Sequence, residues 1–307
     1  MNKGIQPDWI AVDWGTSRLR AWAMGQGGVL EKRHSDDGAQ ALSNTMFEPV
    51  LEKLVADWLT PSRMTSVVCC GMAGSRQGWV DAGYRLAPCP VTNPLSLVRA
   101  PVNCGTMQVW LVPGIKQETP ADVMRGEETQ ISGFLAQEPD FDGVLCLPGT
   151  HTKWVRIEGG QILDFKTFIT GELFALLSEK SILRHSVAGG KWDQEAFASA
   201  FKSTFQEPRK FAGDLFMLRA QSLVADLGAS AARARLSGLL LGLEISAAQR
   251  YLERGKIRIV GAENLAKLYA DALAMIGVSS IHLNADTLTL SGLLQEYTRL
   301  TMLDRVS

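Results

Sequence analysis

Apolar residues at the start of the chain come in short runs separated by glycine-containing turns, and this pattern predicts strands. The runs cover residues 9–14, 19–24 and 29–35, with turns at 15–18 and 26–28. Short runs bounded by turn residues are typical of strands, because a helix needs a longer pattern that repeats every 3.6 residues. The chain is therefore expected to open with a meander of three strands.

A helix is expected after the meander. Thr45 and Glu48 have the spacing of a capping box, Pro49 suits a first helical turn, and apolar residues between 50 and 59 recur at helical spacing. Pro61 ends this helix, since proline cannot continue one. A buried strand at residues 66–70 and a further strand at residues 109–113 are predicted next.

Residues 143–168 repeat the opening arrangement. An apolar strand at 144–147 leads into a turn at 148–153, and strands follow at 154–157 and 162–168. The two segments also share Gly-Thr at the first turn and a cation close behind it. The chain is thus predicted to use one structural unit twice.

The second meander is followed by mostly helical sequence. The predicted helices are residues 194–205, 211–227 and 230–253. A strand at 256–260 then runs through Gly261 into another helix. Because 307 residues exceed what one core usually supports, two domains are expected, at residues 1–117 and 118–307, with a closing helix at 286–303 that packs back on the first.

Composition limits the classes of partner. The net charge is −1 and no long run of like charge occurs, so neither nucleic acid nor a membrane surface is favoured as a partner. The five cysteines include no C-x-x-C pair, which argues against a zinc site. No signal peptide or membrane span is recognised, and a cytoplasmic protein acting on a small molecule is expected.

The two Gly-Thr turns are candidates for binding phosphate. Glycine lets backbone N–H groups approach an anion closely, and neighbouring hydroxyls and cations add to the attraction. The candidate phosphate-binding residues are Gly15, Thr16, Ser17, Gly149, Thr150, His151 and Lys153. Asp13 ends the preceding strand and is the candidate Mg²⁺ ligand, acting through water, since magnesium needs only one or two carboxylates beside the phosphates.

Other interpretations of these turns remain. Asp-x-Gly-Thr also occurs in ordinary hairpins, where aspartate caps the backbone, although two matched turns are harder to explain in that way. A P-loop or Rossmann site is unsupported, because neither glycine motif is present.

A candidate general base lies between the two turns, in Arg125-Gly126-Glu127-Glu128. Transfer of a phosphoryl group to an alcohol needs a carboxylate near the attacking oxygen. Acidic residues also favour a solvated helix start for structural reasons alone. Adjacent helical positions point about 100° apart, so only one of Glu127 and Glu128 is expected to face a substrate.

Taken together, these motifs resemble the actin-like, sugar-kinase and Hsp70 ATPase superfamily. Asp13–Arg18 is similar to its first phosphate motif, Pro148–Lys153 to its second and Val260–Asn264 to its adenosine motif. Six blocks further resemble the 2-dehydro-3-deoxygalactonokinase family: DWGTSRLRAW, GMAGSRQGW, VMRGEETQ, PGTHTKWV, FKTFITGELFALL and RLSGLLLGLE.

This resemblance implies an α/β fold of two ribonuclease-H-like domains with mixed sheets and a nucleotide cleft between them. It implies ATP-dependent phosphorylation of the 6-hydroxyl of 2-dehydro-3-deoxy-D-galactonate, a step of galactonate breakdown, with ATP and Mg²⁺ as cofactors. Asp13 would organise the metal, and Gly261 would join the phosphate turns in contacting nucleotide. The Arg-Gly-Glu-Glu block is also similar to the glutamate motif of exopolyphosphatases, which favours glutamate as the base.

The implied substrate carries a carboxylate, for which arginine is the best partner. The candidate substrate residues are Arg18, Ser75, Arg76, Gln77 and Arg125. Arg20 is a weaker candidate, since it shares a face with Arg18 and pairing with an acid explains it equally well. The gluconate epimer as substrate, a polyphosphate hydrolase, a sugar-responsive regulator, and a monomer or homodimer all remain open.

Overall fold

The computed structural model describes residues 5–91, 97–253 and 255–304 of the chain. These residues form two compact units. The first unit comprises Met1–Phe141, Gly159–Leu163 and Ala285–Ser307, and the second comprises Asp142–Glu158 and Asp164–Asn284. Each unit is described by itself below. Among the described residues, no helix combines the length and apolar character required to cross a bilayer.

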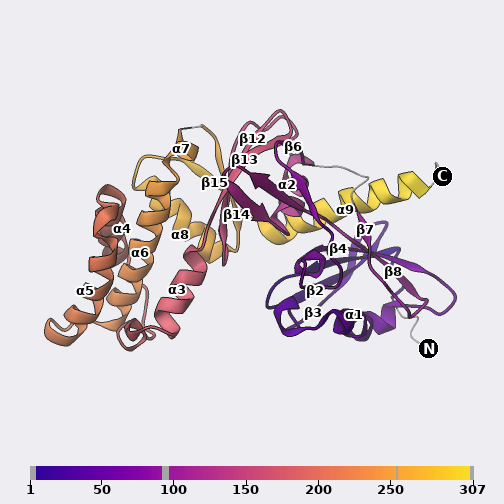
Figure 1. Ribbon diagram of the computed structural model, residues 1–307, viewed down its shortest axis with the longest axis horizontal. Coiled ribbons are helices and arrows are strands. Elements are labelled where there is room, and N and C mark those ends of the chain that lie inside the picture. Colours follow the sequence, from indigo (N-terminus) through magenta and orange to yellow (C-terminus); the bar gives the residue numbers. More distant parts are fainter. Residues whose placement is uncertain (1–4, 92–96, 254, 305–307) are drawn as a thin grey trace. The chain divides into compact units, whose positions relative to one another are not determined.

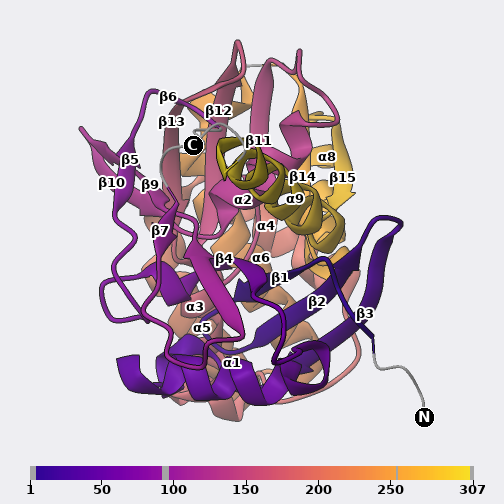
Figure 2. The same cartoon turned by 90° about the vertical axis from the view of Figure 1, so that its right-hand side faces the viewer.

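A mixed six-stranded sheet forms the centre of the first unit. In spatial order its strands are β3 (Gly28–Ser35), β2 (Leu19–Gly25), β1 (Trp9–Trp14), β4 (Thr65–Gly71), β8 (Met107–Leu111) and β7 (Val98–Arg99). The pairs β1–β2 and β2–β3 are antiparallel, whereas β1–β4 and β4–β8 are parallel. The predicted meander and the two later strands are therefore confirmed (Figures 1 and 2).

The alternation of side chains along β1 distributes the core over both faces of this sheet. Ile10, Val12 and Trp14 join one cluster, together with residues of α1 (Phe47–Val55). Trp9 and Ala11 join another, which includes Leu293 of α9 (Ala285–Asp304). Successive residues of a strand point to opposite faces, so Asp13 shares the α9 side with Trp9.

The helix predicted after the meander is present as α1, but the prediction of a capping box at Thr45 and Glu48 is wrong. Met46 occupies the N-cap, and no side chain caps the helix. The carboxylate of Glu48 instead accepts the backbone N–H groups of Asn103 and Cys104, at 2.6 and 2.8 Å. Glu48 therefore binds backbone 55 residues away in the sequence and not the N-cap residue of its own helix.

The first unit continues past residue 117, where the sequence placed the domain boundary. A small sheet follows, with β5 (Tyr84–Leu86), β9 (Gly114–Glu118) and β10 (Ala121–Met124), and then α2 (Glu127–Leu135). The two-residue strand β6 (Cys89–Pro90) is not part of this sheet. It pairs antiparallel with Gln161 and Ile162, which belong to the same unit. Because α2 packs along α9, the unit extends to Phe141 and includes the closing helix.

Helices α2 and α9 can pack closely because each has a glycine where their backbones meet. A Cβ atom on Gly133 would lie 1.9 Å from the carbonyl oxygen of Leu288, and one on Gly292 would lie 1.9 Å from that of Thr129. The hydroxyl of Ser291 also donates to the Gly133 carbonyl, at 3.2 Å. The backbones are therefore in direct contact at two points.

The sheet of the second unit repeats the order of the first. Its strands are β15 (Ser280–Asn284), β14 (Ile257–Gly261), β11 (Gly143–Leu147), β12 (Thr152–Glu158) and β13 (Gln161–Phe168). The pair β11–β12 is antiparallel, and β11–β14 and β14–β15 are parallel. Both units thus contain a mixed sheet of the same strand order, as the repeat predicted, and this agrees with the ribonuclease-H-like domains that the resemblance implied.

Helices are inserted between β13 and β14 (Figure 1). They are α3 (Thr170–Glu179), α4 (Gln194–Gln206), α5 (Phe211–Val224), α6 (Ala229–Ala247) and α7 (Gln249–Leu252), and α8 (Glu263–Ala274) follows β14. The helix predicted at 230–253 is divided into α6 and α7. Gly238 and Gly242 let α6 approach the α4 backbone, because a Cβ at either position would lie under 3 Å from an α4 carbonyl oxygen.

The contact between α2 and α9 leads to a first prediction. Gly292→Ala should destabilise the protein by about 1–3 kcal/mol, because the added methyl group forces two packed backbones apart. Gly213→Ala in α5 is the matched control, since nothing lies within 4 Å of its Cβ position. That substitution should be neutral or stabilising by up to about 1 kcal/mol. Urea unfolding midpoints measure both, and equal midpoints for the two variants would contradict the prediction.

Candidate active site

In the first Gly-Thr turn the backbone groups are hydrogen-bonded, whereas the side chains are exposed to solvent. The N–H of Gly15 donates to the carbonyl of Arg18 at 2.8 Å, and the carbonyls of Gly15 and Thr16 accept N–H groups from residues 39 and 40. Thr16, Ser17 and Arg18 are exposed. Arg18 is 3.9 Å from Asp36 with both side chains largely in water, so that pair contributes little. The turn is therefore rigid and presents hydroxyls and a cation to solvent.

Asp13 lies beneath this turn at the end of β1. Its partner across the antiparallel pair is Arg20, which forms an ion pair with its Oδ2. Its Oδ1 faces Gly71, the last residue of β4, where a Cβ would lie 3.3 Å away. Burial raises the pKa of Asp13, and the charge of Arg20 opposes that rise.

The start of α2 reaches the same place. Gly126, at φ +102°, precedes the helix, and a Cβ on it would lie 3.6 Å from the Cα of Gly71. Glu127 and Glu128 are bound to their own loop. Glu127 Oε2 accepts the N–H of Arg125 at 3.0 Å, and Glu128 Oε2 accepts that of Gly126 at 2.7 Å.

The two glutamates differ in environment. Glu127 is half-buried, whereas Glu128 is 1 % exposed and also accepts the Thr129 hydroxyl, at 3.1 Å. Burial, with the nearby charge of Glu127, raises the pKa of Glu128 to about 7. The interpretation as a solvated helix start therefore fails for Glu128. A carboxyl group with such a pKa can hold or release a proton near neutral pH.

Arg125 lies against the loop that contains Ser75, Arg76 and Gln77. A Cβ on Gly74 would lie 2.9 Å from its Nη1. The guanidinium covers the ring of Tyr84 at 4.4 Å, and Nη2 donates to the carbonyl of Gly83 at 2.9 Å. Its buried Nε and Nη1 have no hydrogen-bond partner among the described residues, which is unusual for a cation.

The three loop residues differ in exposure. Ser75 is buried, and its N–H donates to the carbonyl of Met72 at 3.0 Å. Arg76 and Gln77 are exposed. The structure thus brings Arg125 to the loop, although they are about fifty residues apart in the chain.

In the second unit, the start of α3 covers the other Gly-Thr turn. A Cβ on Gly171 would lie 2.2 Å from the Gly149 carbonyl oxygen, and the Thr150 carbonyl accepts the N–H of Glu172 at 3.0 Å. His151 Nε2 hydrogen-bonds to the Glu172 carboxylate at 2.5 Å. Lys153 is 5 % exposed, and its Nζ lies 3.4 Å from the His151 carbonyl oxygen.

A buried polar network holds the start of β12, the strand that follows this turn. Glu244 of α6 accepts the indole N–H of Trp154 at 2.8 Å and the hydroxyl of Tyr269 at 2.9 Å. The Tyr269 oxygen is 2.8 Å from the Thr152 hydroxyl at the start of β12. Burial raises the pKa of Glu244. Sequence reasoning missed this network, although a lone acid in the apolar stretch RLSGLLLGLE was a signal for it.

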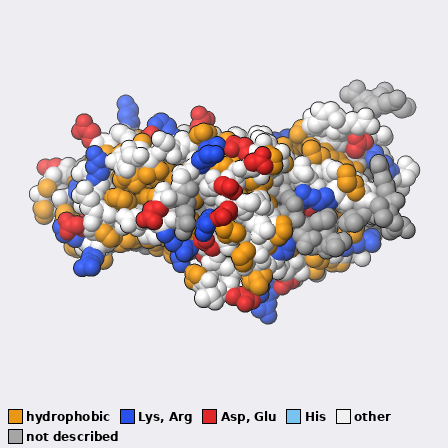
Figure 3. Space-filling view, turned by 90° about the horizontal axis from the view of Figure 1, so that it is seen from above, with side chains coloured by type: hydrophobic (Ala, Val, Ile, Leu, Met, Phe, Trp, Pro, Cys, Tyr) orange, Lys and Arg blue, Asp and Glu red, His pale blue; other side chains and the backbone are white. Residues whose placement is uncertain are grey.

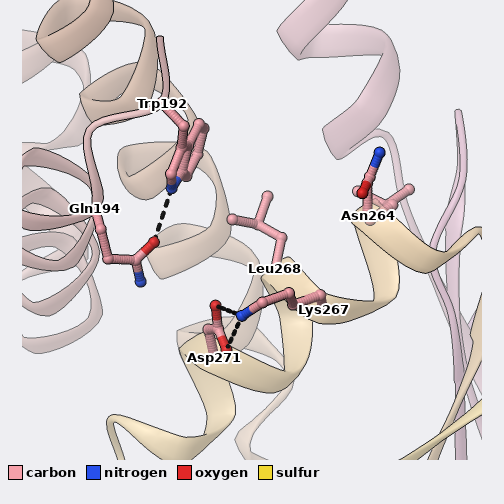
Figure 4. A pocket seen from close by; sticks show the side chains of 7 residues that line it. Trp192, Gln194, Asn264, Lys267, Leu268 and Asp271 are labelled. Atoms are coloured by element: carbon pink, nitrogen blue, oxygen red, sulfur yellow. Dashed lines mark hydrogen bonds and ion pairs between the residues drawn. The ribbon is translucent and has the colours of Figure 1, made fainter.

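Gly261, which ends β14, lies beside the second turn. Its Cβ position is 3.6 Å from Pro148, and α8 begins two residues later. A cavity of about 520 Å³ opens along α8, and Trp192, Gln194, Asn264 and Leu268 are among its lining residues (Figure 4). The Trp192 indole donates to Gln194 Oε1 at 2.7 Å, which fixes both side chains at its edge.

A second cavity, of about 240 Å³, adjoins the first. Trp192, Leu265 and Leu268 line both cavities, and Gly149 and Arg233 line the second. The second cavity therefore lies beside the second Gly-Thr turn and shares part of its lining with the cavity along α8. The sequence did not indicate Trp192 or Arg233, because neither belongs to a motif.

The predicted residues thus form two groups. The first unit brings together Asp13, Glu128 and the glycines between them, with Arg125 at the adjoining loop. The second unit brings together Gly149, Thr150, His151 and Gly261. The cleft expected between the domains stays a prediction. Within the described ranges, no set of three or more His, Cys, Asp or Glu side chains is arranged to hold a metal ion.

Comparison with known proteins supports one family. The model of the family described as 2-keto-3-deoxy-galactonokinase matches residues 13–295. The chain is 32 % identical to the 2-dehydro-3-deoxygalactonokinase of Escherichia coli strain K12, over 93 % of this chain and 96 % of the relative. It is 36 % identical to "Probable 2-dehydro-3-deoxygalactonokinase DgoK1" of Rhizobium meliloti strain 1021, over 93 % and 95 % of the two chains.

A solved structure is similar over the same length. It is the crystal structure of a Sinorhizobium meliloti protein assigned as a 2-dehydro-3-deoxygalactonokinase, with a TM-score of 0.86 and 36 % sequence identity. The similarity covers 94 % of this chain and 97 % of that one.

Proposed function

The chain belongs to the 2-keto-3-deoxy-galactonokinase family, and we propose that it transfers the γ-phosphate of ATP to the 6-hydroxyl of 2-dehydro-3-deoxy-D-galactonate. The observation that carries this proposal is the meeting of Asp13, Gly71 and the Glu127-Glu128 helix start in the first unit. Phosphoryl transfer depends on positioning and on charge stabilisation, for which a metal-binding carboxylate, open glycines and a base are the required groups.

ATP is proposed to bind in the two neighbouring cavities of the second unit. The adenosine would occupy the cavity beside Trp192 and α8, and its phosphates would approach the N–H groups and hydroxyl at Gly149 and Thr150. The first turn, with Thr16 and Ser17 exposed, would contact the γ-phosphate. Since ATP is the phosphate donor of the cytoplasm, the reaction is assigned to that compartment.

Mg²⁺ is proposed to be held by Asp13 together with the nucleotide phosphates. The donor set fits, because magnesium bound to ATP needs only one or two protein carboxylates and keeps several waters. Asp13 Oδ1 is the oxygen that Arg20 does not bind. When bound, the ion would neutralise charge on the phosphates.

The sugar acid is proposed to bind beside Arg125 and the loop at Ser75–Gln77. Its carboxylate would accept hydrogen bonds from Arg125, whose Nε and Nη1 lack acceptors among the described residues. Arg76, Gln77 and the Ser75 hydroxyl are candidates for contacts with the hydroxyls of the substrate. The position of Arg125 three residues before Glu128 would place the substrate near the carboxyl group that accepts its proton.

Glu128 is proposed as the general base. Its pKa of about 7 suits acceptance of a proton from the 6-hydroxyl as the bond to phosphorus forms. Glu127 would contribute through its charge, which helps to raise that pKa, and by holding the Arg125 N–H. A pair of acids with different environments and separate tasks is a common arrangement in active sites.

A polyphosphate hydrolase is the less favoured alternative. A polyanionic substrate would require a continuous cationic surface. The net charge is −1, and Figure 3 shows acidic and basic side chains interspersed over the described part of the face in view.

The first test is ADP release from Mg-ATP with 2-dehydro-3-deoxygalactonate, its gluconate epimer or no acceptor, beside phosphate release from polyphosphate without ATP. Rapid release is expected only with the first compound. Asp13→Asn should lower turnover by at least about a hundredfold, since phosphate charge is then poorly neutralised. Equal rates with both epimers would widen the substrate class, and release that never exceeds the acceptor-free rate would refute the kinase.

The two glutamates give a paired test. Glu128→Gln should lower kcat by about 10²–10⁴-fold, the usual contribution of a general base, and Glu127→Gln by less than about tenfold. Because the active form is deprotonated, kcat/KM of the wild type should fall as pH drops below about 7. The Glu128→Gln profile should be flat there. A residual inflection near pH 7 in this variant would show that another group is responsible.

Arg125 can be tested against a matched arginine. Arg125→Lys should raise KM for the sugar acid by about tenfold or more while leaving KM for ATP unchanged, because lysine cannot reproduce the planar set of donors. Arg85→Lys is the control. Arg85 also has a buried Nε without a partner, but its two Nη groups donate to the carbonyls of Pro90 and Val91. Similar shifts in both variants would indicate a general structural effect.

A further inference from the structure

Arg20 joins two carboxylates that lie far apart in the chain. Its Nη2 forms an ion pair with Asp13 Oδ2, and its Nη1 forms one with Asp286 Oδ1. Arg20 faces Asp13 because the two residues are directly opposed in the β1–β2 register. Asp286 is 266 residues away from Arg20 in sequence, and all three side chains belong to the first unit.

The three side chains lead from the interior to the surface. Their exposed fractions rise from 14 % for Asp13 to 28 % for Arg20 and 43 % for Asp286. At the outer end, Lys32 Nζ donates to Asp286 Oδ2 at 3.1 Å. Asp286 thus holds one oxygen on Arg20 and the other on Lys32.

Asp286 is fixed by its place in the chain. It lies in the first turn of α9, where the helix dipole favours an acidic residue. The strand β15 ends at Asn284, the last residue of the second unit, so Asp286 follows immediately after the chain enters the first unit. Thr289 Oγ1 donates to the Ala285 carbonyl at 2.9 Å within the same turn.

This arrangement determines which carboxylate oxygen of Asp13 binds Arg20 and which does not. The terminal torsion of an aspartate is soft, so a carboxylate without a fixed partner can rotate between two equivalent orientations. With Oδ2 bound by Arg20, Oδ1 is the oxygen directed toward Gly71 and the glycine at the start of α2. Asp286 restrains the guanidinium of Arg20 at its other end.

We propose that Arg20 and Asp286 are positioning residues for the reaction: Asp286 orients Arg20, and Arg20 fixes the Asp13 carboxylate so that Oδ1 is presented to the magnesium–nucleotide complex. This inference rests on the proposed function, through the assignment of Asp13 to the metal. Groups that orient a metal ligand typically change metal affinity or activity by about 10–100-fold when removed.

The test compares Asp286→Ala with Asp57→Ala. Asp57 also pairs with an arginine in the first unit, Arg33 at 3.5 Å, and its side chain is 82 % exposed. The first readout is the Mg²⁺ concentration that gives half of the rise in melting temperature produced by ADP. The second is kcat for acceptor-dependent ADP release. Asp286→Ala should raise the half-saturating Mg²⁺ by about 10-fold or more and lower kcat similarly, with Asp57→Ala within twofold of wild type.

Other outcomes would overturn the proposal. If Asp286→Ala lowers the melting temperature without changing the half-saturating Mg²⁺, its role is structural only. If Arg20→Lys, which keeps one charge but cannot span both carboxylates, behaves as wild type in both readouts, Arg20 does not position Asp13. The Mg²⁺–ADP readout requires no sugar acid, so it distinguishes failure of this proposal from failure of the kinase assignment.

Discussion

The backbone contact between α2 and α9 is the constraint on which the site of the first unit depends. Gly133 and Gly292 allow the helices to touch, and the carbonyl that Gly292 meets belongs to Thr129, one residue after Glu128. The crossing therefore fixes the start of α2, which carries the glutamates, relative to α9, which carries Asp286. Two positions without a side chain, Gly133 and Gly292, are what permit this contact.

The two copies of the Gly-Thr turn have diverged in their surroundings. In the first unit the turn is closed by residues 38–40, and its hydroxyls are exposed. In the second it is covered by α3 and supported by the buried Glu244 network. The same local sequence thus forms an exposed turn in the first unit and a covered, supported turn in the second. This difference is expected if the first turn contacts the transferred phosphate and the second turn binds the rest of the nucleotide.

The parts of the fold that could be predicted from sequence are those determined by residues close together in the chain. Alternation and glycine turns identified the meanders and their repeat, because side-chain direction in a strand has a period of two. The capping box at Thr45–Glu48 was wrong because distant N–H groups bind Glu48. The link from Arg20 to Asp286 was beyond local reasoning, although pairing of Arg20 with an acid was foreseen. Trp192 gave no signal, since its role depends on where α8 lies.

The return of α9 to the first unit has a consequence for biosynthesis. Leu293 and Leu300 cover Trp9, Trp22 and Val68, and the Tyr297 ring stacks on Trp9 at 4.4 Å. A ribosome completes the sheet that carries these residues long before it reaches the helix that covers them. One apolar face of the nascent sheet must therefore stay uncovered while the whole second unit is translated, and this is the interval in which the chain is most exposed to aggregation and most in need of a chaperone.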